Sequence, residues 1–273
     1  MATKIPYCDE AWNPVVGCSP VSPGCDHCYA ARVASRGLTE RHRGLATGGR
    51  WTGEVRLVPE VLDVPLQWRK PRRVLVPSMG DLFHPSVSHE YRACVFGVMV
   101  SSAHTFLVLT KRAEAMLCRT EASASLHFCR PPVDLRPPHA RTRLRGGVAH
   151  LEWMPVGSRA LLPDAVPPPN ILLGVTVENQ AAAERRLPIL HELAMAGWRT
   201  WISVEPLLGP VDLRLGIGSA SWVAVGGETG PGARRCHTSW IRSVVDQCAE
   251  VFVPVFVKQI GTNSAYRGGV DTW

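Results

Sequence analysis

Six short segments of the chain are nearly apolar throughout instead of alternating between apolar and polar residues. They are rich in Val, Ile and Leu, and they cover residues 74–78, 105–110, 171–177, 200–204, 222–227 and 253–259. Strands that are buried on both faces have this pattern, because helices cover both sides of a parallel sheet. A shorter segment at residues 14–17 would begin the series, so we expect about seven strands.

Longer stretches with helical spacing separate the apolar segments. They lie at residues 88–101, 179–196 and 238–251, and a shorter one lies at residues 29–36. Strands and helices that alternate at these intervals predict βαβ units and an α/β fold. The 273 residues would form one large domain or two small ones, since a single α/β barrel commonly needs about 250 residues.

Polar residues stand at the carboxyl end of nearly every apolar segment. In chain order they are Asp81, Lys111, Arg112, Glu178, Asn179, Glu205, Glu228 and Lys258. Helix capping alone would explain the acidic residues and the asparagine. Lys and Arg gain nothing from the start of a helix, however, and ligands of α/β proteins bind at the carboxyl ends of strands. The repeated pattern therefore predicts a functional site at this edge of the sheet.

Residues 119–169 interrupt the alternation. They are rich in Arg and Pro, show no sustained period, and lie between the third and fourth expected strands. Insertions of this length are usually functional or disordered. Their arginines contribute to a formal net charge of +7, which favours a polyanionic partner such as nucleic acid. A solvated basic surface would have the same composition.

The composition bounds the class of protein. Hydrophobic residues make up 45% and charged residues 19% of the chain, which is ordinary for a globular protein. The sequence contains no apolar run long enough to span a membrane and no secretory signal, so we expect a cytoplasmic protein with no membrane partner. In a reducing compartment, clustered cysteines are metal ligands and scattered ones are small buried residues.

Three of the nine cysteines, Cys18, Cys25 and Cys28, form such a cluster with the spacing Cys-x6-Cys-x2-Cys. The prolines, serine and glycine between them favour a tight, non-helical loop in which the thiolates converge. A 4Fe–4S cluster normally takes four cysteine ligands. Three would leave one iron open to a substrate or cofactor.

Zinc is the competing metal at these cysteines. Cys8 or His27 could complete a tetrahedral zinc site, although the chain has no second Cys-x2-Cys pair. His27 lies between Cys25 and Cys28, where simultaneous ligation by all three side chains would be cramped. The spacing favours an iron–sulfur cluster over zinc.

The chain resembles an uncharacterised family of phage and bacterial proteins, described as three-cysteine-motif proteins with radical S-adenosylmethionine (SAM)-like sequence. The resembling segments are WNPVVGC with GCDHCYA, VPSMGDLFHPSV, FLVLTKR, LGVTVENQ, SVEPLLGPVDL, WVAVGGETGPGARR and VPVFVKQIG, in this order. The resemblance implies one radical-SAM-like domain over residues 1–273. Its fold would be a partial (βα) barrel of about six to seven parallel strands, with residues 119–169 inserted. The first cysteine interval departs from the commonest radical SAM motif, which has three residues there instead of six.

The resemblance also implies cofactors and roles. Cys18, Cys25 and Cys28 would hold a 4Fe–4S cluster, and SAM would bind its open iron and be cleaved to a 5′-deoxyadenosyl radical. Gly80 and Asp81 would contact the methionine amino group, and Glu178 and Asn179 the ribose. The catalytic residues on the substrate side would be Lys258, Glu205 and Glu228, with Lys258 as a proton donor. An electron donor such as flavodoxin or ferredoxin would supply the electron, and a partner protein is a further expectation.

Two functions of different classes follow from these observations. The first is a radical SAM enzyme that acts on a nucleic acid or nucleotide, in DNA modification or repair. The alternative is a non-catalytic zinc-binding protein that binds nucleic acid. The alternative explains the cysteines and arginines but not the polar residues at the strand ends. An iron–sulfur electron carrier would seldom need a barrel.

Overall fold

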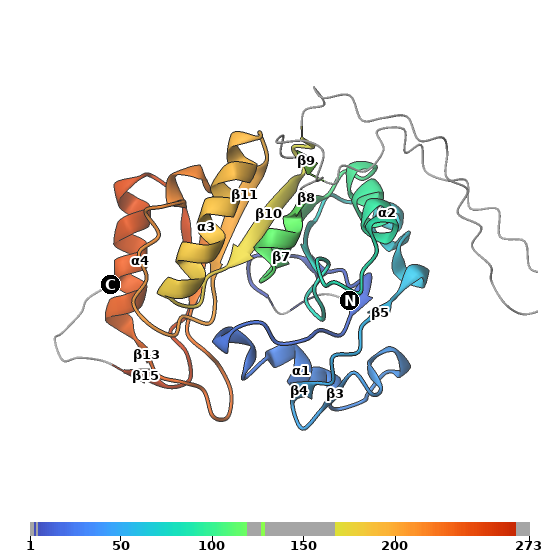
Figure 1. The fold of residues 1–273 in the computed structure, drawn as a ribbon, viewed down its shortest axis with the longest axis horizontal. Helices are drawn as coiled ribbons and strands as arrows, with labels where there is room; N and C mark the ends of the chain where they lie inside the picture. Colours follow the sequence, from blue (N-terminus) through green and yellow to red (C-terminus); the bar gives the residue numbers. More distant parts are fainter. Residues whose placement is uncertain (1–2, 4, 119–126, 129–166, 266–273) are drawn as a thin grey trace, which may run out of the picture.

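The computed structural model describes residues 3, 5–118, 127–128 and 167–265. Its centre is a seven-stranded sheet that curls into a half-barrel, and every strand pairing within it is parallel (Figure 1). The strands are, in order across the sheet, β1 (Glu10–Ala11), β6 (Arg73–Val76), β7 (Thr105–Thr110), β10 (Ile171–Thr176), β11 (Arg199–Val204), β12 (Val223–Gly226) and β14 (Val255–Gln259). This order is the order of the sequence, so the predicted α/β partial barrel is confirmed.

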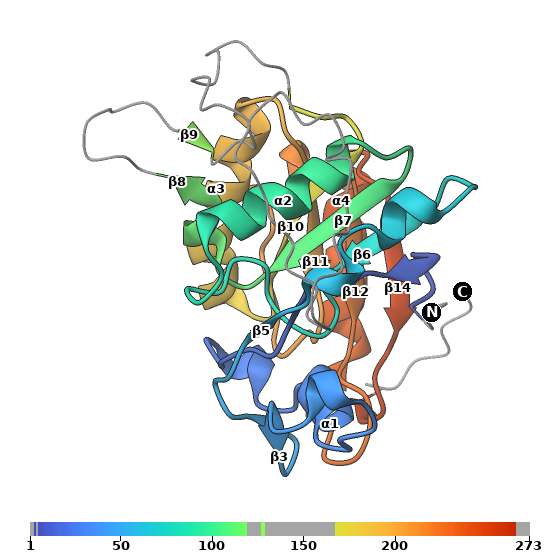
Figure 2. The ribbon, with the colours of Figure 1, turned by 90° about the vertical axis from the view of Figure 1, so that its right-hand side faces the viewer.

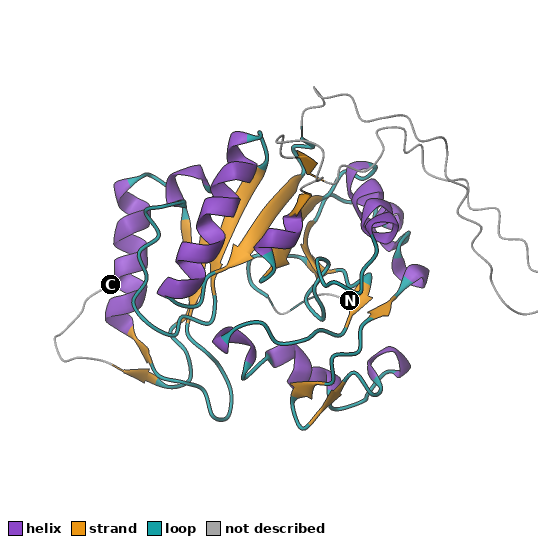
Figure 3. Ribbon diagram, viewed as in Figure 1, coloured by secondary structure: helices purple, strands orange, loops and turns teal. Residues whose placement is uncertain are grey.

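Three long helices cover the outer face of the sheet (Figure 3): α2 (His89–Val100), α3 (Gln180–Met195) and α4 (Thr238–Glu250). Side chains cap the first two. The Ser88 hydroxyl accepts a hydrogen bond from the Tyr91 amide, and the Asn179 side-chain oxygen accepts one from the Ala182 amide. Each cap satisfies an amide that has no partner within its helix. No helix of the described residues has the length and apolar character that crossing a membrane requires.

Both faces of the central strands are buried, as their continuous apolar character predicted. All six residues of β10 are buried. Ile171, Leu173 and Val175 belong to the outer core with Leu187 of α3, whereas Leu172 faces the inside of the half-barrel. Burial of each aliphatic side chain contributes about 1.5–3 kcal/mol, so these strands anchor the fold.

Aromatic side chains fill the inside of the half-barrel. Trp201 of β11 stacks on Trp222, with ring centroids 5.0 Å apart and an angle of 2° between the rings. Tyr7 precedes the edge strand β1, and its ring contacts Trp222 and also Phe256 of the opposite edge strand β14. Tyr7 therefore bridges the two open edges of the half-barrel from within.

A smaller unit, built between β1 and β6, lies at one end of the sheet (Figures 1 and 2). It contains α1 (Tyr29–Ala34) and the hairpin of β3 (Ala46–Thr47) and β4 (Arg50–Trp51). Its own small core includes Val16, Ala31 and Leu45. The remaining elements are β2 (Val15–Val16), β5 (Arg56–Leu57), β8 (Leu117–Cys118), β9 (His127–Phe128), β13 (Cys236–His237), β15 (Ser264–Ala265), and the short 3₁₀ turns Pro23–Cys25, Glu40–His42, Pro59–Val61, Val64–Gln67, Ala113–Met116 and Ile217–Ser219.

The prediction that residues 14–17 form the first strand of the main sheet is wrong. The sheet begins with β1, and Val15–Val16 forms β2, which pairs antiparallel with β5. Between them the Asn13 side-chain oxygen accepts hydrogen bonds from the amides of Ser78 and Met79, and Pro14 has no N–H to donate. The ladder therefore stops before residue 14. The predicted insertion at residues 119–169 lies outside the described residues except for 127–128 and 167–169.

Candidate functional site

A cavity of about 430 Å³ lies at the carboxyl ends of the strands. The loop of residues 18–28, which we call the cysteine loop, forms one wall together with α1. The strand ends form the other wall. Among the residues predicted for the site, the structure brings these to the cavity: Cys18, Cys25, Cys28, Gly80, Asp81, Lys111, Arg112, Glu205, Glu228 and Lys258. Glu178 and Asn179 are not among the lining residues. A cavity of this size is within the range for small-molecule sites.

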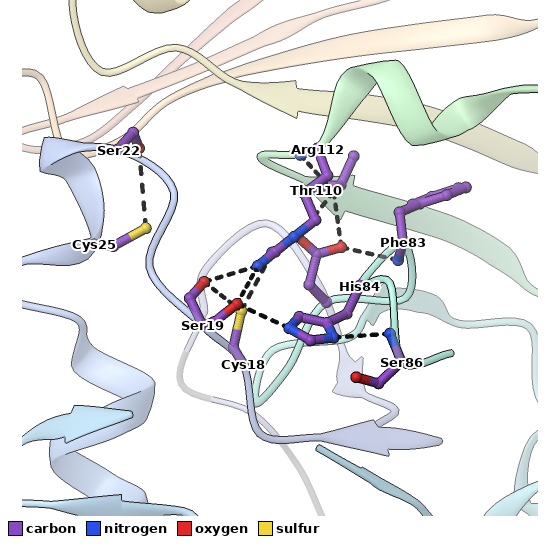
Figure 4. Close-up of polar contacts among 10 residues, drawn as sticks. Cys18, Ser19, Ser22, Cys25, Phe83, His84, Ser86, Thr110 and Arg112 are labelled. Atoms are coloured by element: carbon purple, nitrogen blue, oxygen red, sulfur yellow. Dashed lines mark hydrogen bonds and ion pairs between the residues drawn. The ribbon is translucent and has the colours of Figure 1, made fainter. Parts of the chain in front are cut away.

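The three cysteines of the wall are free thiols of intermediate exposure. The Cys18 thiol donates a hydrogen bond to the Ser19 carbonyl over 3.4 Å, and the Cys25 sulfur lies 3.9 Å from the Ser22 hydroxyl (Figure 4). Burial and the nearby Asp81 carboxylate raise the pKa of the Cys18 thiol to about 11, against the opposing charge of Arg112. Within the described residues, no three Cys, His, Asp or Glu side chains are grouped as ligands of one metal ion.

An ion pair between Asp81 and Arg112 holds the first cysteine. Arg112 Nη1 donates to Asp81 Oδ2 over 2.8 Å and to the Cys18 sulfur over 3.4 Å. Its Nη2 donates to the carbonyl and the hydroxyl of Ser19, over 2.8 and 2.9 Å (Figure 4). Thr110 and the Phe83 amide donate further hydrogen bonds to Asp81. The buried Asp81 carboxylate is thus fully engaged with the protein.

The Ser19–His84 contact beside this pair is an anchor and not a nucleophile–base pair. The Ser19 hydroxyl lies 2.9 Å from His84 Nε2, and the Ser86 amide donates to His84 Nδ1. Because Nδ1 accepts, Nε2 of the neutral ring carries the proton and donates to Ser19. Burial and the charge of Arg112 lower the His84 pKa, which favours the neutral ring. A base would need Nε2 free of its proton.

A second ion pair, Glu178 with Arg186 of α3, lies beneath the middle of the cysteine loop. Glu178 Oε2 accepts from Arg186 Nη1 over 2.7 Å, and both side chains are 0% exposed. The loop rests directly on this pair, since a Cβ on Gly24 would come within 3.0 Å of the Glu178 carboxyl carbon. Burial alone would raise the Glu178 pKa, but the charge of Arg186 beside it holds the pKa below its usual value.

A third ion pair, Glu228 with Arg234, holds the end of the loop. Arg234 donates to both Glu228 oxygens, over 2.6 and 3.0 Å, and to the Pro23 carbonyl over 2.7 Å. His27 Nδ1 lies 2.9 Å from Glu228 Oε2. Burial opposes ionisation of Glu228, yet the hydrogen bonds from Arg234 and His27 lower its pKa to about 2. Glu228 is therefore a carboxylate at neutral pH.

Together, the three acid–arginine pairs support the cysteine loop from below, and we call these three pairs the seat of the loop. The acidic residues of the three pairs follow strands β6, β10 and β12, and each pair lies against a different part of the loop. Close approach of the backbones adds to the seat. Gly17 forms a parallel bridge with Gly80, where a Cβ on Gly80 would lie 2.7 Å from the Val15 carbonyl oxygen.

The fourth acid–base pair, Glu205 with Lys258, differs because no contact joins it to the cysteine loop in the described structure. Lys258 Nζ lies 3.1 Å from Glu205 Oε1, and the Tyr7 hydroxyl donates to Glu205 Oε2 over 3.1 Å. The Lys258 ammonium also lies 5.6 Å from the centre of the Tyr7 ring. Burial, with the adjacent Glu205, raises the Tyr7 pKa, so the phenol keeps its proton.

The sequence did not indicate four residues that complete this site: Tyr7, His27 as a partner of Glu228, Arg186 and Arg234. Tyr7 and His27 lie about 200 positions from their carboxylates, and no spacing rule connects such positions. Arg186 follows Glu178 by eight residues, which is about two helical turns. That interval, and the six positions between Glu228 and Arg234, are local signals that could have suggested the pairs.

Half-barrel topology, a cavity at the strand ends and a free three-cysteine loop define the class: an α/β partial-barrel protein with a candidate thiol-ligated site. The chain belongs to the family described as "Protein of unknown function (DUF5131)", whose family model matches residues 2–268.

None of the curated proteins compared with the chain matches it. Among solved structures, the chain is similar to a mutant form of spore photoproduct lyase, with a TM-score of 0.43 and 10% sequence identity over 84% of this chain. The match spans 58% of that protein.

Proposed function

We propose that this protein is an iron–sulfur enzyme of the radical SAM type that acts on a nucleic acid or nucleotide, in DNA modification or repair. The observation that carries the proposal is the placement of the cysteine loop. Its three free thiols line the cavity at the carboxyl ends of the half-barrel strands, where α/β proteins bind their ligands.

The donor chemistry of the loop fits a 4Fe–4S cluster. Thiolates are the ligands that iron–sulfur clusters prefer, and each cysteine binds a different iron. Cys18, Cys25 and Cys28 carry no disulfide and are partly exposed to the cavity. With three protein ligands, one coordination position is left for SAM. When bound, the cluster and SAM would supply the 5′-deoxyadenosyl radical.

The residues around the loop would fix it in place. Asp81, Glu178 and Glu228 are each occupied by an arginine that also lies against the loop or under it. Their role in the proposed enzyme is to position the cysteines. Arg112 would in addition donate its hydrogen bond to the Cys18 thiolate, and such bonds to cluster sulfurs tune the reduction potential. Gly80 remains the candidate for contact with the methionine part of SAM.

Nucleic acid or nucleotide is the proposed substrate class because of charge. The chain has a net charge of +7, and positive charge attracts the phosphate backbone. Lys258 and Glu205, which face the cavity away from the loop, would act on the substrate side.

Metal analysis tests the proposal. Protein purified without oxygen is expected to contain about four irons and about four sulfides per chain, with little zinc. SAM is expected to bind this protein and not the cluster-free chain. One zinc per chain without iron, or equal SAM affinity with and without the cluster, would contradict the proposal.

A further inference from the structure

The carboxylates that line the cavity are all neutralised by the protein itself. They are Asp81, Glu205 and Glu228, and they form ion pairs with Arg112, Lys258 and Arg234. Tyr7 donates a hydrogen bond to Glu205 Oε2, and the Lys258 ammonium lies 3.1 Å from the buried Oε1 and balances the charge of the carboxylate. These carboxylates therefore have little capacity to bind a further cation in the cavity.

The lining cations, in contrast, have donors to spare. Lys111 follows β7 and lines the cavity, and among the described residues it forms no hydrogen bond or ion pair. The Glu178 carboxylate is close enough for the two charges to interact, but Arg186 already binds it. Lys258 uses one direction of its ammonium group for Glu205, and its side chain is 27% exposed. An ammonium group has three donors and no acceptor.

We propose that the unpaired ammonium group of Lys111 binds a phosphate group of the substrate in this cavity, and that Lys258 of the same lining adds positive charge and hydrogen-bond donors. This inference rests on the proposed function and narrows its substrate class to a phosphorylated molecule, such as a nucleotide or a nucleotide unit of a strand. A phosphate offers several acceptor oxygens and negative charge, which matches two ammonium groups with unused donors. The cavity of about 430 Å³ has the volume of a typical small-molecule site.

Tyr7 acts as a positioning residue for this site. Its hydroxyl fixes Glu205, and its ring lies beside the Lys258 ammonium. Glu205 and the ring together restrict where the ammonium can lie, while leaving its other donors directed elsewhere. A cation held in this way loses less side-chain entropy when a ligand binds.

Binding of defined probes tests the phosphate site. The probes are the four deoxynucleoside 5′-monophosphates and the four deoxynucleosides, and their binding is measured by calorimetry on the full chain as purified without oxygen. Lys111→Met is the main variant, because this lysine has no partner whose loss would unfold the protein. We expect it to weaken monophosphate binding about 10- to 100-fold, the scale of one charged hydrogen bond, and to leave nucleoside binding unchanged. The double variant Glu205→Gln/Lys258→Met, which leaves no unpaired charge, is expected to do the same.

Two controls separate this inference from the proposed function. Lys70→Met changes an exposed lysine outside the cavity, and it should bind the monophosphates like the parent protein. Iron content should be the same in all variants, so a parent protein without iron would defeat the proposed function and not this test. The phosphate site is overturned if Lys111→Met binds the monophosphates unchanged. It is also overturned if the variant loses affinity for SAM alone, because the oxyanion would then be the SAM carboxylate.

Discussion

Replacing Cys18, Cys25 or Cys28 singly by alanine is expected to remove almost all bound iron from protein purified without oxygen. Each thiolate would bind one iron of the cluster, and two remaining ligands could not hold a cubane against loss to solvent. Iron should fall from about four per chain to well below one, and sulfide should fall with it. Colorimetric iron and sulfide assays on the purified variants measure this.

Cys94→Ala is the matched control for these variants. Cys94 is also a free, partly exposed thiol, but it lies in α2 and does not line the cavity. It should keep the full iron content. Thermal melting, followed by circular dichroism, should show that all four variants fold. Full iron in a folded Cys25→Ala protein would mean that the cluster has another ligand set.

Arg186→Met is expected to lower the free energy of unfolding by about 3–5 kcal/mol. Arg186 and Glu178 are both 0% exposed, so the substitution leaves a buried carboxylate without its counter-ion. The Arg186 side chain also donates to the Thr176 carbonyl over 2.6 Å at the end of β10, and that bond is lost as well. Urea unfolding of the parent and variant proteins measures the difference.

The neighbouring residue supplies the control for Arg186. Arg185 forms an ion pair with Glu114 in which the side chains are 51% and 53% exposed, and exposed pairs contribute about 1 kcal/mol or less. Arg185→Met should therefore have little effect. Glu178→Gln combined with Arg186→Met should recover part of the lost stability, because no buried charge then remains. Equal stability of the two single arginine variants would show that the buried pair does not support the fold.

The central strands were predictable because their residues are buried on both faces. A segment such as β10, in which every residue is buried, has no polar position to confuse its pattern. The first strand was misplaced for a local reason. Val15 and Val16 are as apolar as a strand of the sheet, but Asn13 and Pro14 turn the chain away before them. Apolar character shows that a segment is buried, and it does not show which sheet it joins.

The sequence predicted where the candidate site lies, but it did not predict which side chains contact one another there. The carboxyl ends of parallel strands meet at one edge of a sheet, and the sequence therefore indicated that Asp81, Glu205 and Lys258 share a region. The sequence did not indicate that arginines form ion pairs with most of the carboxylates at the strand ends. Arg234 reaches both Glu228 and the Pro23 carbonyl, which lies 211 positions earlier in the chain. Such contacts depend on the folded loop and have no spacing pattern.

This division of the strand-end residues gives the site two sides. Asp81, Glu178 and Glu228 are committed to the seat of the cysteine loop. Glu205, Lys258 and Tyr7 form a separate group on the other wall of the cavity. In the proposed enzyme, substitutions in the seat should impair the cluster, whereas substitutions in the second group should impair only the use of substrate.

The central claim is that this chain binds SAM at a cysteine-held cluster and cleaves it, and the formation of 5′-deoxyadenosine tests it most directly. Cluster-loaded protein is reduced with dithionite in the presence of SAM, and the products are separated by liquid chromatography. The account predicts 5′-deoxyadenosine and methionine from the parent protein and neither from Cys25→Ala. SAM that remains intact with reduced protein carrying a full complement of iron and sulfide would contradict it.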